Sequence, residues 1–88
     1  MNLSKATRLA RVKAMAASGE AKRVRTAARL SMRDVAMAVG VDTSTVCKWE
    51  AGTRVPRGDA AWRYAELIDG LARRTAAPQA SRQLDVER

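Results

Sequence analysis

Residues 30–52, LSMRDVAMAVGVDTSTVCKWEAG, contain two closely spaced helix starts, and this pattern limits the possible folds more than any other part of the sequence. Ser31 is suited to be a helix N-cap, and Asp34 in the following turn completes a capping box. Asp42 provides a second N-cap. Between the two starts lies Gly40, which suits the positive φ at which a helix often ends. The stretch therefore predicts a short helix, a sharp corner and a second short helix.

The apolar residues of these two helices recur at the helical spacings of three and four, so each helix has one face for a core. They are Val35, Ala36 and Val39 in the first helix and Val46 and Trp49 in the second. Val41 fills the corner, and the small Ala36 allows two steeply crossed helices to approach closely. The pattern thus predicts a packed helical corner.

Short, mostly hydrogen-bonding side chains remain on the outward face of the second helix: Thr43, Ser44, Cys47 and Lys48. Such a face can enter the major groove of duplex DNA, and the helix N-terminus favours phosphate. The alternative is an ordinary polar surface beside a well-packed corner. The spacing favours the DNA-binding interpretation.

The composition predicts one small all-α domain. The chain has 88 residues, of which 47% are hydrophobic, largely alanine, and it contains no Phe. No apolar run approaches the ~20 residues that span a bilayer, and the N-terminus lacks an apolar signal core. We therefore expect a cytoplasmic protein with no membrane partner.

The chemistry-bearing residue types argue against an enzyme. The chain has one cysteine and no histidine, which leaves no ligand set for zinc and no base for a hydrolytic triad. No glycine-rich phosphate loop is present either. A redox role for Cys47 lacks a resolving partner. We expect no catalytic residue, no metal and no cofactor.

The charge distribution indicates a polyanionic partner. Lys and Arg number 17 against 9 Asp and Glu, giving a net charge of +8, and the first 29 residues carry eight of these cations against Glu20 alone. Nucleic acid is the usual partner of so basic a chain. One Tyr and two Trp are too few for single-strand binding by base stacking, so duplex DNA is favoured.

The flanking sequence divides the chain into three segments. Residues 1–18 predict a basic amphipathic helix, which is either docked on the domain, an arm along DNA phosphates or a partner-binding helix. Residues 19–72 form the central domain, with a second helix over 20–29 that Ser18 can cap. Residues 73–88 show no apolar period and predict a frayed or disordered tail, with a short helix near Leu84 as the alternative.

The last helix of the central domain is expected to end near Ala72. In it Trp62 is expected in the core, whereas Tyr64 and Leu67 point elsewhere and, if exposed, would make a dimer patch.

The central stretch resembles the helix-turn-helix of the lambda-repressor and Cro-like family of bacterial and phage regulators. The resemblance rests on the family's small residue, turn glycine, corner hydrophobe, recognition-helix core, Trp-Glu-x-Gly ending and following proline: Ala36, Gly40, Val41, Val46, Trp49, Glu50, Gly52 and Pro56. It covers residues 20–70. It implies an all-α bundle of about five short helices with a central helix-turn-helix.

The resemblance also implies residue roles. In that family the positions of Thr43, Ser44, Cys47 and Lys48 face the bases. An arginine at the position of Arg25 pairs with the glutamate at that of Glu50. We therefore assign structural roles to Arg25, Ala36, Gly40, Val46, Trp49 and Glu50.

Phosphate contacts are expected from cations and hydroxyls around the motif, since such contacts set register without reading sequence. The loop 53–58 supplies two arginines, a hydroxyl and free backbone N–H groups. The candidates are Lys22, Arg23, Arg33, Thr53, Arg54 and Arg57.

The leading hypothesis is a sequence-specific transcriptional regulator of the phage or bacterial repressor type. One recognition helix reads only a few base pairs, which favours a homodimer on a palindromic operator. No ligand domain follows the motif, so no small-molecule ligand is expected. The alternative is a protein-interaction module, such as an antitoxin-like or recombination accessory factor, whose basic N-terminal helix grips an acidic partner.

Overall fold

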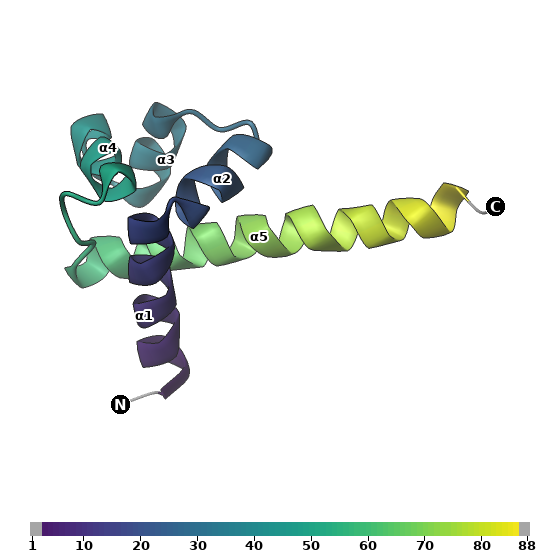
Figure 1. Cartoon of the computed structure of the whole chain (residues 1–88), viewed down its shortest axis with the longest axis horizontal. Coiled ribbons are helices and arrows are strands. Elements are labelled where there is room, and N and C mark those ends of the chain that lie inside the picture. Colours follow the sequence, from purple (N-terminus) through teal and green to yellow (C-terminus); the bar gives the residue numbers. More distant parts are fainter. Residues whose placement is uncertain (1–2, 87–88) are drawn as a thin grey trace.

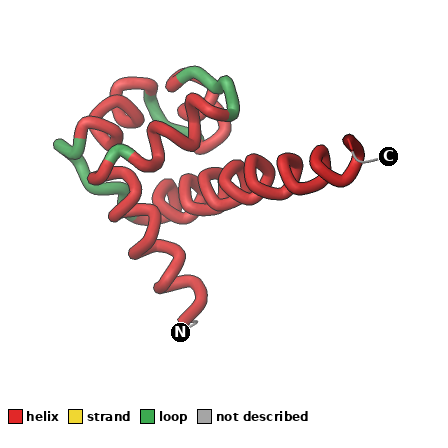
Figure 2. Tube along the Cα trace, turned by 45° about the vertical axis from the view of Figure 1, so that its right-hand side comes forward, coloured by secondary structure: helices red, strands yellow, loops and turns green. Residues whose placement is uncertain are grey.

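Five helices make up the protein in the computed structural model, which describes the backbone of residues 3–86 and the side chains of residues 4–74. They are α1 (Leu3–Ser18), α2 (Glu20–Ala27), α3 (Met32–Val39), α4 (Thr43–Ala51) and α5 (Gly58–Val86). The described residues contain no strand (Figures 1 and 2), which confirms the all-α class. None of the described helices is long and apolar enough to cross a membrane.

The basic helix α1 is docked on the domain. Its apolar stripe, Val12, Met15 and Ala16, is buried in the same core as residues of all the other helices. Two of its arginines also meet α5: Arg8 Nε lies 3.1 Å from Asp69 Oδ2, and Arg11 Nη1 lies 3.9 Å from Asp69 Oδ1. Of the three alternatives for this segment, the structure shows the docked amphipathic helix.

The corner between α3 and α4 forms as the local sequence predicts. Ser31 Oγ accepts a hydrogen bond from the Asp34 N–H, and the Asp34 carboxylate accepts one from the Ser31 N–H, both at 2.9 Å. Gly40 ends α3 with φ of 86°, where a side chain would strain the backbone, and its N–H donates to the Ala36 carbonyl. Asp42 occupies the N-cap position of α4, but its side chain makes no capping hydrogen bond.

The core lies where α3, α4 and α5 meet, next to α1. Val35, Ala36, Val39, Val46 and Trp49 are all buried, as their spacing predicts. From α5 they meet Tyr64, Ala65 and Ile68. Burial of this apolar surface is the main force that holds α4 in place, since a helix of nine residues is too short to be stable alone.

Two predictions about the aromatic residues of α5 are wrong. Trp62 is only half-buried, because it lies at the edge of the contact with α1, where Lys5 Nζ is 4.9 Å and the Arg8 guanidinium 5.4 Å from its ring centroid. Tyr64 is 1% exposed, with its ring 4.6 Å from that of Trp49. Leu67 is partly buried against the core. Tyr64 and Leu67 are therefore not exposed, as the predicted dimer patch would require.

The bounds of two helices also differ from those predicted. α2 ends at Ala27, and Arg29, expected inside it, adopts a positive φ of 62°. α5 does not end near Ala72 but continues to Val86, projecting beyond the rest of the molecule (Figure 1). The extension is rich in alanine, arginine and glutamine, which favour a helix, but it also passes through Pro78, which disfavours a helix interior, so helix propensity alone does not explain the continuation. The side chains of residues 75–88, in the predicted tail, lie outside the described part.

Candidate nucleic-acid interface

The outward face of α4 is open to solvent. Thr43, Ser44, Cys47 and Lys48 are all exposed, while Val46 and Trp49 on the opposite face are buried. Figure 1 shows α4 at one end of the molecule, with α1 running away from it. The N-terminal helix therefore does not cover the face on which the sequence places the base contacts.

A buried ion pair ties α4 to α2. Arg25 Nε donates to Glu50 Oε2 at 2.5 Å, and Arg25 Nη2 donates to Glu50 Oε1 at 2.9 Å. The side chains are 8% and 4% exposed, and Arg25 Nη1 also donates to the Leu30 carbonyl at 2.8 Å. The hydrogen bonds that Arg25 donates to the Glu50 carboxylate raise the pKa of Arg25, so its guanidinium stays charged. This arrangement, which the resemblance implies, fixes the orientation of α4 against α2.

The hydroxyl of Tyr64 is buried beside this pair and has no hydrogen-bond partner among the described residues. Burial is the main cause that raises its pKa to about 12; the negative charge of Glu50 adds to the rise, and Arg25 opposes it. The hydroxyl is therefore neutral at physiological pH. Tyr64 contributes to the site as a large apolar surface against Trp49, which anchors α4 from behind.

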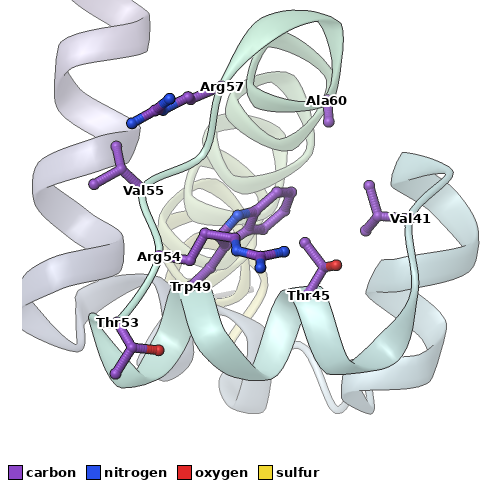
Figure 3. A pocket seen from close by; sticks show the side chains of 8 residues that line it. All are labelled: Val41, Thr45, Trp49, Thr53, Arg54, Val55, Arg57 and Ala60. Atoms are coloured by element: carbon purple, nitrogen blue, oxygen red, sulfur yellow. The ribbon is translucent and has the colours of Figure 1, made fainter.

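An open groove of about 550 Å³ runs beside α4 and the loop that follows it (Figure 3). It is lined by Val41, Thr45, Trp49, Thr53, Arg54, Val55, Arg57 and Ala60. In Figure 3 the Arg54 side chain extends from the loop toward Thr45, whereas Arg57 extends to the other side of the loop. Neither arginine forms an ion pair within the described residues, and the lining contains no carboxylate. The groove therefore favours an anion.

The other predicted phosphate contacts are placed differently. Arg33 is exposed on the first turn of α3, and Lys22 and Arg23 are exposed on α2. Arg23 is engaged locally, with Nη2 2.8 Å from Glu20 Oε1. Thr53 Oγ1 donates to the Lys48 carbonyl at 3.3 Å and so helps to terminate α4. Thr53, Arg54 and Arg57 all line the groove, although Arg54 and Arg57 extend to different sides of the loop, whereas Arg33, Lys22 and Arg23 do not line it.

Sequence reasoning missed two residues at this site. Thr45 lies one position beyond Ser44 and is half-buried at the groove. The sequence signal that could have indicated Thr45 is its place in the first turn of the helix that begins at Thr43. Arg63 of α5 donates from Nε to the Val39 carbonyl at 2.7 Å, at the end of α3. No local pattern marks Arg63, because its partner is 24 residues away.

The described side chains contain no group of three His, Cys, Asp or Glu residues that could hold a metal ion. The donors at the surface around α4 are hydroxyls, one amine, one thiol and guanidinium groups. Such groups can donate hydrogen bonds to base edges and phosphates, which is the chemistry of nucleic-acid recognition.

A short helix set against its neighbour at a glycine corner, with an exposed polar face and an arginine-bearing loop beside it, defines a helix-turn-helix DNA-binding domain. The helix-turn-helix family model HTH_3 matches residues 22–70, more than half of the chain, and the chain belongs to this family of lambda-repressor and Cro-like DNA-binding regulators. The helix α1 precedes the matched segment. No curated protein and no solved structure gives a significant match to the chain.

Proposed function

We propose that this chain is a sequence-specific repressor of the phage or bacterial Cro type, acting in the cytoplasm on duplex operators. One observation carries the proposal: Thr43, Ser44, Cys47 and Lys48 are all exposed on a helix whose opposite face is buried in the core. Family membership supports duplex DNA as the partner.

The chemistry of the four side chains suggests a role for each. The Lys48 ammonium would donate to the O6 and N7 acceptors of a guanine. The hydroxyls of Thr43 and Ser44, in the first turn of α4, would contact bases or a nearby phosphate. Cys47, a small thiol without a partner in the described residues, would contact the methyl group of a thymine.

The groove beside α4 would hold the flanking phosphates. Arg54 supplies the charge, and the newly identified Thr45 supplies a hydroxyl at its edge. Arg57, which extends to the other side of the loop, and Thr53, whose hydroxyl donates to the Lys48 carbonyl, would have to turn their side chains to bind a phosphate there. Arg33, at the start of α3, would bind a further phosphate, while Lys22 and Arg23 would add weaker contacts from α2. With about four to seven phosphates neutralised, affinity would fall steeply with salt concentration.

The basic helix α1 has less support as a grip for an acidic partner. Arg8 and Arg11 already face Asp69, and Lys5 and Arg8 lie over Trp62. These contacts draw the cations of α1 onto α5. The antitoxin-like or recombination accessory function therefore ranks second.

Selection of bound sequences from a pool of random duplexes tests the proposal. We expect enrichment of a single palindromic site, because one helix reads only a few base pairs and two copies are needed for useful affinity. Enrichment of an isolated half-site would retain specificity but overturn the dimer. A pool that stays random after repeated rounds would overturn sequence-specific binding.

A further inference from the structure

The corner between α3 and α4 is held from outside the motif by an arginine of α5. Arg63 Nε donates to the Val39 carbonyl at 2.7 Å, and Arg63 Nη2 would lie 3.7 Å from a Cβ at Gly40. Val39 is the last residue of α3 and is 1% exposed. The guanidinium therefore binds a buried carbonyl that helix geometry leaves without a partner in its own helix.

The electrostatics of this contact are favourable. The carbonyl end of a helix carries partial negative charge, so a cation there is attracted to the end of α3 as a whole. The bond is also charge-assisted, which makes it stronger than one between neutral groups. Arg63 is thus placed to hold the end of α3 in one position.

The start of α4 has no side-chain capping hydrogen bond of its own. Asp42 has the backbone conformation of an N-cap, with φ of −73° and ψ of 150°, but its side chain accepts no capping hydrogen bond. By contrast, the start of α3 has a complete capping box. Only the three residues 40–42 connect the two helices. A shift at Val39 is therefore transmitted directly to the first turn of α4.

Arg63 also lies close to the groove beside α4. Val41 of the corner and Ala60 of α5 both line the groove (Figure 3), and Arg63 follows Ala60 by one helical turn. The corner is therefore flanked by two successive turns of α5. The turn with Ala60 lines the same groove as the corner, and the turn with Arg63 hydrogen-bonds to the end of α3.

We propose that Arg63 is a positioning residue for DNA reading: by binding the Val39 carbonyl it fixes the corner, and thereby the angle at which the first turn of α4 meets the bases. It needs no contact with DNA to do so. This inference rests on the proposed function, because it concerns base recognition by α4.

The test compares Arg63→Gln with Arg74→Gln, which removes the same charge from an exposed position of α5. Affinity is measured for the selected operator and for a scrambled duplex at one salt concentration. Arg63→Gln should lower operator affinity by about tenfold (about 1.4 kcal/mol), because the corner that this bond orders in the free protein would then have to be ordered on binding. Scrambled-duplex affinity should fall no more than in Arg74→Gln. Arg63→Lys should recover part of the loss, since an ammonium can donate to the same carbonyl.

Amide hydrogen exchange of the free protein supplies a measurement that does not depend on DNA. In Arg63→Gln we expect faster exchange at residues 41–46, with unchanged protection at Ala65 and Ile68. Equal acceleration throughout the core would show general destabilisation and overturn the positioning role, as would an unchanged ratio of operator to scrambled affinity. Failure of the proposed function would instead leave the wild-type protein without a preferred sequence, whatever the exchange pattern. If Arg63→Gln does not fold, Arg63→Lys is carried through both measurements.

Discussion

Arg25 and Glu50 form a two-pronged ion pair that joins the helix before the motif to the last turn of the recognition helix. Both side chains are almost fully withdrawn from water. A pair in this setting is held by geometry and hydrogen bonds, because removal of both charges from water opposes their attraction. Its main consequence is that neither partner can be removed alone without leaving an uncompensated buried charge.

Substitution of one member of this pair should therefore be strongly destabilising. Arg25→Ala or Glu50→Ala should lower the free energy of unfolding by about 3–5 kcal/mol. The double variant Arg25→Met/Glu50→Leu should lose less than the two single variants combined, since no charge is stranded. Urea denaturation followed by circular dichroism measures both. This view would be contradicted if a single substitution at Arg25 or Glu50 lowered the free energy of unfolding no more than a substitution in an exposed ion pair, such as that of Arg23 with Glu20.

Tyr64 should make the protein sensitive to alkaline pH. Its pKa is about 12 in the folded protein against 10.0 ordinarily, so above pH 10 the unfolded chain loses this proton first. The contribution to stability is complete below pH 10 and declines as pH rises toward 12, by at most about 3 kcal/mol. The measurement is the free energy of unfolding as a function of pH.

Tyr64→Phe is the matched control for that measurement. It should abolish this part of the pH dependence, and at pH 7 it should change stability by less than about 1 kcal/mol, because the hydroxyl has no partner to lose. A larger loss at pH 7 would mean that the hydroxyl makes a bond in solution. Identical alkaline profiles for the two proteins would exclude Tyr64 as their cause.

One lysine and one arginine substitution should separate base reading from phosphate binding. Lys48→Ala should reduce the preference for operator over scrambled duplex by about 1–3 kcal/mol. Arg54→Ala should weaken both duplexes alike and reduce the slope of log affinity against log salt by about 1. Fluorescence anisotropy over a salt series measures both quantities. If Lys48→Ala keeps the full preference, the base-contact assignment on α4 is wrong.

The two N-caps of the motif should differ in their effect on stability. Ser31→Ala removes a hydrogen bond to the Asp34 N–H and should cost about 1 kcal/mol. Asp42→Ala removes no capping hydrogen bond and should cost distinctly less, although both residues are of types favoured at an N-cap. Thermal unfolding of the two variants under one condition decides between them. Equal losses would show that Asp42 caps α4 in solution.

The corner and its core faces were predictable because their determinants are local. The capping box of Ser31 and Asp34, the positive φ of Gly40 and the buried stripe of Val46 and Trp49 each depend on residues within one or two turns. The same holds for the exposure of Lys48, which follows from helical spacing once its neighbours are buried. For the pair of Arg25 and Glu50 the signal was family resemblance, since no spacing rule links positions 25 residues apart.

The tertiary structure alone decided which neighbour each face meets. Helical spacing shows that α5 has a buried side, but it does not show that α1 reaches the edge at Trp62 while Tyr64 packs on Trp49. The bond from Arg63 to the Val39 carbonyl, and the joining of Thr45 to the groove, likewise depend on distant segments. The sequence by itself determined that the helices and the corner form, but not where α2 and α5 end, because helix formation and capping come from short-range sterics. Contacts across the chain determined the partners, because packing depends on the shape of all five helices together.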